Sequence, residues 1–126
     1  MSGVKTLLAI VELGGYPDFS AVYENHGLAV LKANSMRKAL ALLKKQAPDV
    51  VVAEFIYGPT YGSQLSNFES LFAILQRHAP QAKLIAFLHK EDMPHLQRLT
   101  ARFPIHARLF YPIDAQKLEQ SLVDIS

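Results

Sequence analysis

The sequence predicts an α/β fold in which helices cover both faces of a five-stranded parallel sheet, the doubly wound arrangement. Five short apolar runs without strict alternation recur along the 126 residues, and segments with helical spacing separate them. Such runs are typical of strands buried on both faces. Parallel neighbours need crossover connections, which helices supply. The length suits one core, so we expect a single domain over residues 1–126.

The expected strands are the apolar runs, each bounded by turn-forming residues. They are TLLAIV at 6–11, LAVLKA at 28–33, DVVVAEF at 49–55, KLIAFL at 83–88 and ARLFY at 107–111. Ligands of doubly wound sheets bind outside the carboxyl ends of the strands. Functional residues are therefore expected just after these runs.

The expected helices lie between the strands. The first, about 18–26, offers Phe19, Val22 and Tyr23 as an inner face, with Gly27 as its stop. The others are 35–46, 67–78, 93–103 and 114–125. Their predicted inner faces comprise Met36, Leu40 and Leu43; Phe68, Leu71, Phe72 and Leu75; Leu96, Leu99 and Phe103; and Leu118, Leu122 and Ile125.

Start signals support three of these helices. Ser66 stands three residues before Glu69, the spacing of a capping box, in which two side chains satisfy free amides of the first turn. Asp92 and Asp114 each precede a helical segment and are predicted N-caps. Pro94 fits a first turn, where its missing N–H is not needed.

Composition excludes several classes of function. Half of the residues are apolar and 19% are charged, as in ordinary globular proteins. The formal charge is +2, and basic residues such as Lys44, Lys45, Arg98 and Arg102 are scattered among acids, so nucleic-acid binding is not expected. The chain has no cysteine, which excludes disulfides and thiolate sites. No apolar run approaches the ~20 residues of a membrane span, and we expect a cytoplasmic protein.

Two segments resemble the receiver domain of two-component response regulators. YPIDAQKLEQSL, 111–122, is similar to the Lys-Pro-apolar-Asp-x-x-x-Leu segment that leads into the last helix of that family. APDVVVAEF, 47–55, is similar to its third strand, which ends in an acid. The resemblance covers the whole chain in element order and length. It implies a flavodoxin-like, three-layer (βα)5 sandwich with strand order 2-1-3-4-5.

The resemblance also implies a phosphorylation pocket, from which this sequence departs. In the family an Asp after strand three accepts a phosphoryl group, aided by Mg²⁺ on two acids after strand one, a hydroxyl after strand four and a Lys before the strand-five Pro. Here Glu54 holds the acceptor position, and Glu12 is the only acid after strand one. Phe87 replaces the hydroxyl, and Tyr111, before Pro112, replaces the Lys. A phenol cannot substitute for an ammonium, so we expect a degenerate pocket without metal.

Three interpretations of Glu54 follow. It accepts phosphate, it imitates a phosphorylated Asp, or it is a remnant carboxylate that hydrogen-bonds nearby backbone amides. The third is favoured, because the second acid, the hydroxyl and the Lys are missing together. Phe87 and Tyr111 are expected to fill the pocket with aromatic bulk.

The resemblance further implies a contact surface on helix four, strand five and helix five, where family members dimerise or meet partners. In this chain that surface comprises His95, Arg98, Arg102, Arg108, Lys117 and Gln120. Tyr57 and Tyr61, after strand three, either form an adaptable contact surface or cover the strand ends. We expect a protein that signals by contact with protein partners, with a possible homodimer.

Metal, enzyme and cofactor functions receive less support. His89 and His95 show no metal-binding spacing, and surface histidines are expected. The segment ELGGYPD after strand one offers Gly14 and Gly15 but no hydroxyl for a phosphate before Ser20. We therefore expect no enzyme activity and no cofactor. The alternatives that remain are a residual phosphoryl switch on Glu54 and a small-ligand or cofactor site at the strand ends.

Overall fold

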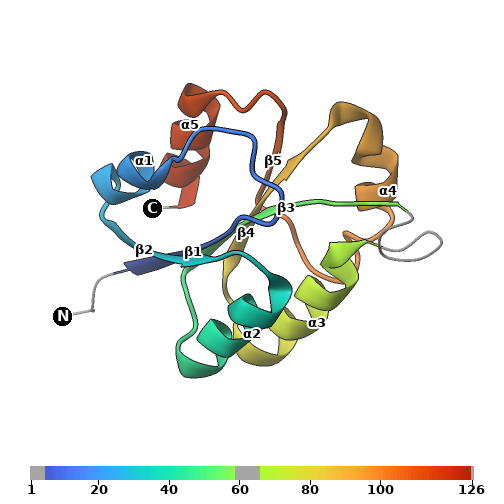
Figure 1. The fold of residues 1–126 in the computed structure, drawn as a ribbon, viewed down its shortest axis with the longest axis horizontal. Coiled ribbons are helices and arrows are strands. Elements are labelled where there is room, and N and C mark those ends of the chain that lie inside the picture. The colour runs from blue at the N-terminus through green and yellow to red at the C-terminus, as the bar shows by residue number, and fades with distance from the viewer. Residues whose placement is uncertain (1–4, 59–65, 126) are drawn as a thin grey trace.

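The computed structural model describes residues 5–58 and 66–125, in which strands and helices alternate (Figure 1). The strands are β1 (Lys5–Ile10), β2 (Leu28–Ala33), β3 (Val50–Glu54), β4 (Lys83–Leu88) and β5 (Ala107–Phe110). The helices are α1 (Ser20–Asn25), α2 (Met36–Lys45), α3 (Asn67–His78), α4 (Met93–Gln97) and α5 (Ala115–Ile125), with a 3-10 turn, η2 (Lys90–Asp92), before α4.

The five strands form one parallel sheet in the order β2-β1-β3-β4-β5. This confirms the predicted fold class and strand order. In the register, Ala53 pairs with both Ile10 and Ala86, and Glu54 pairs with Phe87. The carboxyl ends of β1, β3 and β4 therefore lie level, and Glu54 sits at the centre of that edge.

Helices cover both faces of the sheet. Figure 1 shows α1 and α5 on one face, with α2 and α3 on the other. Alternate residues of each strand enter separate cores: Val50 and Val52 pack with the α1 and α5 side, Val51 and Ala53 with the α2 and α3 side. Burial on both faces explains the continuous apolar runs of β1, β3 and β4. The edge strands β2 and β5 are only partly buried, so the expectation of strands buried on both faces was wrong for these two.

Several predicted helix boundaries are confirmed. Ser66 and Glu69 form the capping box at the start of α3. Asp114 Oδ1 accepts a hydrogen bond from the Gln116 amide at 2.8 Å, as a capping residue does. Gly27 follows α1 with a φ of 78°, a left-handed conformation that ends a helix readily only with glycine.

The fourth helix is shorter than predicted, since α4 ends at Gln97 rather than at residue 103. The Thr100 hydroxyl donates to the Gln97 carbonyl at 2.9 Å and so competes with the helical hydrogen bonds. Asp92 makes no capping bond, because it ends η2 with φ −90° and ψ −2° instead of extended backbone. Leu96 and Phe103 nevertheless reach the core.

The inner face of α2 also differs from the prediction. Ala39 and Leu43 are buried, and Met36 and Leu42 pack beside them, whereas Leu40 is only half-buried and lies outside this core. The small Ala39 side chain, fully buried, faces the core at the position where the pattern favoured Leu40. Every residue of ALALL, 39–43, is apolar, so the sequence did not show which face of the helix is buried.

Candidate functional site

Glu54 ends β3 as a buried carboxylate, 1% exposed. Its Oε1 accepts a hydrogen bond from the Leu13 amide at 2.8 Å. Its Oε2 accepts two, from the Gly14 amide at 3.2 Å and from the Tyr16 hydroxyl at 2.6 Å. Buried charge is tolerated where such donors replace water. The structure thus shows the hydrogen bonds from backbone amides that are expected if Glu54 is a remnant carboxylate.

The loop after β1 is shaped to supply these donors. Gly14 and Gly15 have φ values of 71° and 86°, in the left-handed region that other residues adopt only at a cost. Two consecutive amides, of Leu13 and Gly14, thereby converge on one carboxylate, as in the backbone concavities that bind anions. Here the anion is the protein's own side chain.

Tyr16 closes the site from outside. Its ring lies edge-on to Phe87, with centroids 5.2 Å apart, and 6.0 Å from the ring of Tyr111. Burial, followed by the hydrogen bond and charge of Glu54, raises the pKa of Tyr16 well above its ordinary value of 10. The phenol therefore keeps its proton and remains a donor. The expectation of no hydroxyl before Ser20 was wrong, because it overlooked the phenol of Tyr16.

Asn67 is a second residue that the sequence analysis missed. This side chain, 1% exposed, donates from Nδ2 to Glu12 Oε1 at 2.8 Å and to the Glu54 carbonyl at 2.6 Å. Its Oδ1 accepts from the Ile56 amide at 2.8 Å. Asn67 thus ties the loop after β1 and the end of β3 to the start of α3. The signal available in the sequence was an Asn directly after the predicted cap residue Ser66.

The aromatic residues at the family's hydroxyl and Lys positions are placed beside the carboxylate. Phe87 is fully buried, and Tyr111 is half-buried, 4.7 Å from the ring of His89. Burial, and then the charge of Glu54, raises the pKa of Tyr111 above its ordinary value. Both rings fill the inner part of the pocket with uncharged groups.

The aromatic rings do not fill the whole pocket. A cavity of about 790 Å³ remains outside them, between the loop at residues 13–17, the segment after β3 that includes Tyr57, and residues 111–113 with Pro112. We call this space the strand-end cavity. It lies where ligands of doubly wound sheets bind.

The predicted contact residues fall into separate groups. His95 stacks on Tyr57, with centroids 3.8 Å apart and planes 8° from parallel, and contacts Arg98 through Nδ1. Glu69 and Leu99 line a small cleft beside them. Tyr57 thus packs on a histidine, and His95 is half-buried rather than freely solvated. Tyr61 lies outside the described residues.

The remaining contact residues lie in the segment after α4, on β5 and on α5. Arg102 is exposed, and its carbonyl accepts a bond from Gln76 of α3. Arg108, on β5, is half-buried, and its Nε has no hydrogen-bond partner in the described part of the chain. Lys117 and Gln120 are exposed on α5, and Gln120 donates to Asp124 at 3.0 Å.

Within residues 5–58 and 66–125, no group of three or more His, Asp or Glu side chains is arranged to hold a metal ion. In the same ranges, no helix has the length and apolar character needed to cross a membrane.

Comparison with known proteins identifies the fold. No protein-family model and no curated protein matches the chain. Solved structures do: a response regulator from Thermotoga maritima (TM-score 0.75, 15% identity, 97% of each chain covered) and a receiver domain protein from Clostridium thermocellum (0.70, 21%, 97% of this chain and 93% of that one). A signal receiver domain from Pseudomonas fluorescens Pf-5 matches with a TM-score of 0.73 and 16% identity, and the match covers 98% of this chain and 94% of that one. The chain therefore has the response-regulator receiver fold.

Proposed function

We propose that this chain is a receiver-like signalling domain of the cytoplasm that acts by contact with protein partners, without catalysis and without phosphorylation of Glu54. One observation carries the proposal. The carboxylate at the acceptor position is buried, and both of its oxygens are already held by donors from the protein's own loop.

Phosphoryl transfer needs an oxygen that is aligned with the incoming phosphorus and groups that meet the developing charge. Glu54 presents neither oxygen outward, because the Leu13 and Gly14 amides and the Tyr16 hydroxyl occupy them. The surrounding side chains are a fully buried Phe87 and a neutral Tyr111. Phe87 has no hydrogen-bond donor, and a neutral phenol supplies no positive charge to a transferred phosphoryl group.

The residues present also do not fit the Mg²⁺ ion that receivers use. Mg²⁺ prefers several oxygen ligands in octahedral geometry. Glu12 Oε1 accepts from Asn67, and the oxygens of Glu54 face N–H and O–H donors. The neighbours Val11 and Leu13 carry apolar, exposed side chains. No step of the proposed function runs through a metal.

The proposed role of Glu54 is to fix one conformation of the loop after β1. The carboxylate acts as a built-in anion, which draws in the amides and the phenol that would otherwise need water. A domain held in one state presents a constant surface to its partners. This differs from a switch, in which an added phosphoryl group shifts a population between two states.

Amide NMR tests the proposal. ¹⁵N-labelled protein receives Mg²⁺, then beryllofluoride, which stands in for a phosphoryl group, and a parallel sample is incubated with acetyl phosphate for mass spectrometry. We expect unchanged amide peaks for Leu13, Gly14 and Phe87, and no mass gain. A phosphorylatable receiver domain, treated in the same way, is the positive control. Saturable shifts at those amides, or a mass gain of one phosphoryl group that Glu54→Gln abolishes, would show a working switch.

A further inference from the structure

The strand-end cavity has walls of aromatic rings. Tyr16 and Tyr111 stand 6.0 Å apart at 31°, and His89 lies 4.7 Å from Tyr111. Tyr57 forms part of the opposite wall and is itself stacked on His95. Rings that are packed against other rings lose little further freedom when a flat molecule settles on them. The cavity therefore offers preformed stacking surfaces.

The size of the cavity suits a small molecule. Its volume of about 790 Å³ lies within the range of roughly 300–1,000 Å³ that is usual for ligand pockets. Aliphatic residues and prolines complete the lining, so most of the wall is apolar. Apolar walls with a few polar groups are the usual composition of such sites.

The charges around the cavity define what it accepts. Among the described residues that line it, there is no Lys or Arg, and Asp92 is the one carboxylate. Glu54 lies directly behind Tyr16 and adds negative charge. Tyr16 and Tyr111 stay protonated, because burial and Glu54 raise the pKa of both phenols. A phosphate or carboxylate would meet no cation here and would face two carboxylates.

We propose that the strand-end cavity is a binding site for a planar aromatic small molecule that carries no negative charge, either neutral or cationic. The rings supply stacking, and for a cation they add attraction to the π faces beside Asp92. The site goes beyond the signalling role and does not rest on it, since the cavity exists whether or not Glu54 is ever modified.

Three planar probes separate the possibilities: proflavine, a cation; riboflavin, which is neutral; and FMN, the same ring system as riboflavin with a phosphate. Binding is followed by probe fluorescence, which stacking on tyrosine quenches, and by amide NMR, at about pH 8, where histidines as a class are neutral. We expect saturable binding of proflavine and riboflavin, with shifts at Gly14, Tyr57 and Tyr111. At low salt, FMN should bind at least about tenfold more weakly than riboflavin, because its phosphate meets the negative charges around the cavity.

Two neighbouring aromatic residues give a matched pair of variants. Tyr111→Ala removes a cavity wall and should weaken riboflavin binding by about tenfold or more, the usual size of one stacking interaction. Tyr111→Phe keeps the ring and should bind normally. Phe110→Ala removes an adjacent ring, 38% exposed, that does not line the cavity, and should also bind normally. Circular dichroism checks that each variant is folded.

The proposal fails if no probe binds with a dissociation constant below ~1 mM, because the corresponding binding free energy is too small for a built site. It also fails if FMN binds as tightly as riboflavin, or if Phe110→Ala and Tyr111→Ala weaken binding equally. These results are distinct from failure of the signalling proposal, which depends on beryllofluoride and acetyl phosphate and would leave riboflavin binding unchanged.

Discussion

At the scale of single residues, the hydrogen-bond donors around Glu54 explain why its carboxylate can be buried. An ionised carboxylate in a protein interior is costly unless charge-assisted hydrogen bonds replace its water. Three donors from Leu13, Gly14 and Tyr16 meet that need, although they lie some 40 residues earlier in the chain. The carboxylate is thus a structural centre that joins the loop after β1 to the end of β3.

Tyr16→Phe tests this explanation. The variant removes the hydroxyl that donates to Glu54 Oε2 at 2.6 Å and leaves the ring packing in place. A hydrogen bond to a buried charged group contributes about 1.5–3 kcal/mol, so we expect the free energy of unfolding to fall by about that amount. Urea denaturation measures it.

Tyr111→Phe is the matched control for that measurement. Its hydroxyl makes no hydrogen bond to any residue in 5–58 or 66–125, so the change in the free energy of unfolding should stay within about 0.5 kcal/mol. Equal losses in the two variants would show that the Tyr16 hydroxyl has no special role in holding the carboxylate.

The sequence indicated where the site lies but not how its atoms are connected. An acid at the end of an apolar strand placed Glu54, and the family pattern placed Phe87 and Tyr111 near it. The partners Tyr16 and Asn67 were not predicted, because their approach depends on a loop with two consecutive left-handed glycines and on the packing of the start of α3. Such loop geometry has no periodic signature in the sequence.

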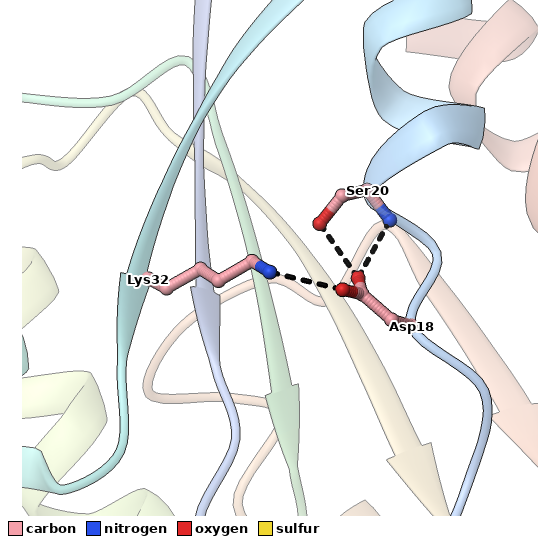
Figure 2. Close-up of polar contacts among 3 residues, drawn as sticks. All are labelled: Asp18, Ser20 and Lys32. Atoms are coloured by element: carbon pink, nitrogen blue, oxygen red, sulfur yellow. Dashed lines mark hydrogen bonds and ion pairs between the residues drawn. The ribbon is translucent and has the colours of Figure 1, made fainter.

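At the scale of elements, the connection from β1 to α1 is held by Asp18 (Figure 2). Its Oδ1 accepts from the Ser20 amide at 2.9 Å and from the Ser20 hydroxyl at 2.6 Å. Its Oδ2 pairs with Lys32 Nζ of β2 at 3.0 Å. The hydroxyl of Ser20, followed by its amide and by Lys32, lowers the pKa of Asp18 to about 2.

A pH dependence follows from this lowered pKa. Stability contributed by a carboxylate with a depressed folded pKa is present above its unfolded pKa, 3.8, and is lost as pH falls toward the folded value of about 2. Asp18→Asn should therefore have a lower urea midpoint than the parent near neutral pH, and the difference should vanish between about pH 4 and pH 2. The effect is small, because Asp18 is exposed.

Salt distinguishes the sources of the Asp18 effect. The largest cause is a short-range hydrogen bond from Ser20, and screening acts mainly on the Lys32 pair. Most of the difference between the parent and Asp18→Asn should therefore persist in added NaCl, measured again by urea midpoints. A difference that is lost in salt, or one that stays constant down to pH 2, would contradict this account.

The elements that were predicted best are those with a strong pattern. Residues 67–78 and 83–88 match α3 and β4 in full, because a capping box marks the start of α3 and continuous burial marks β4. Residues 28–33 also match β2, which is only partly buried and begins directly after Gly27. Helix α4 was overestimated, since the apolar spacing of Leu96, Leu99 and Phe103 continues through turns that are not helical. Apolar spacing indicates which residues reach the core, not the backbone path between them.

At the scale of the whole molecule, the receiver fold is shared with solved structures at low sequence identity. Five of the solved structures that match are 15–23% identical to this chain, and each match covers 92% or more of the solved chain. The alternation of buried strands and covering helices tolerates many apolar exchanges. A phosphorylation pocket tolerates few, because each charged group has one position.

The surface formed by α4, β5 and α5 is the proposed place for a second copy of this chain. Strand β5 is an edge of the sheet, and edge strands invite pairing or covering. Phe110 is 38% exposed there, and Arg108 is half-buried beside it. This surface carries exposed basic residues, Arg98 and Arg102, and an exposed acidic residue of α5, Glu119. We therefore expect a twofold arrangement that pairs these opposite charges across the interface.

Sedimentation velocity over a range of concentrations tests this arrangement. We expect a reversible dimer that weakens with added salt, because opposite charges meet across it. Phe110→Ser and Arg108→Glu should each raise the dimer dissociation constant by about tenfold or more, as loss of a central contact does. Lys44 is an exposed residue of α2, so Lys44→Glu reverses a charge outside this surface and should leave association unchanged. A monomer at every concentration, or equal weakening by Lys44→Glu, would place the partner surface elsewhere on the domain.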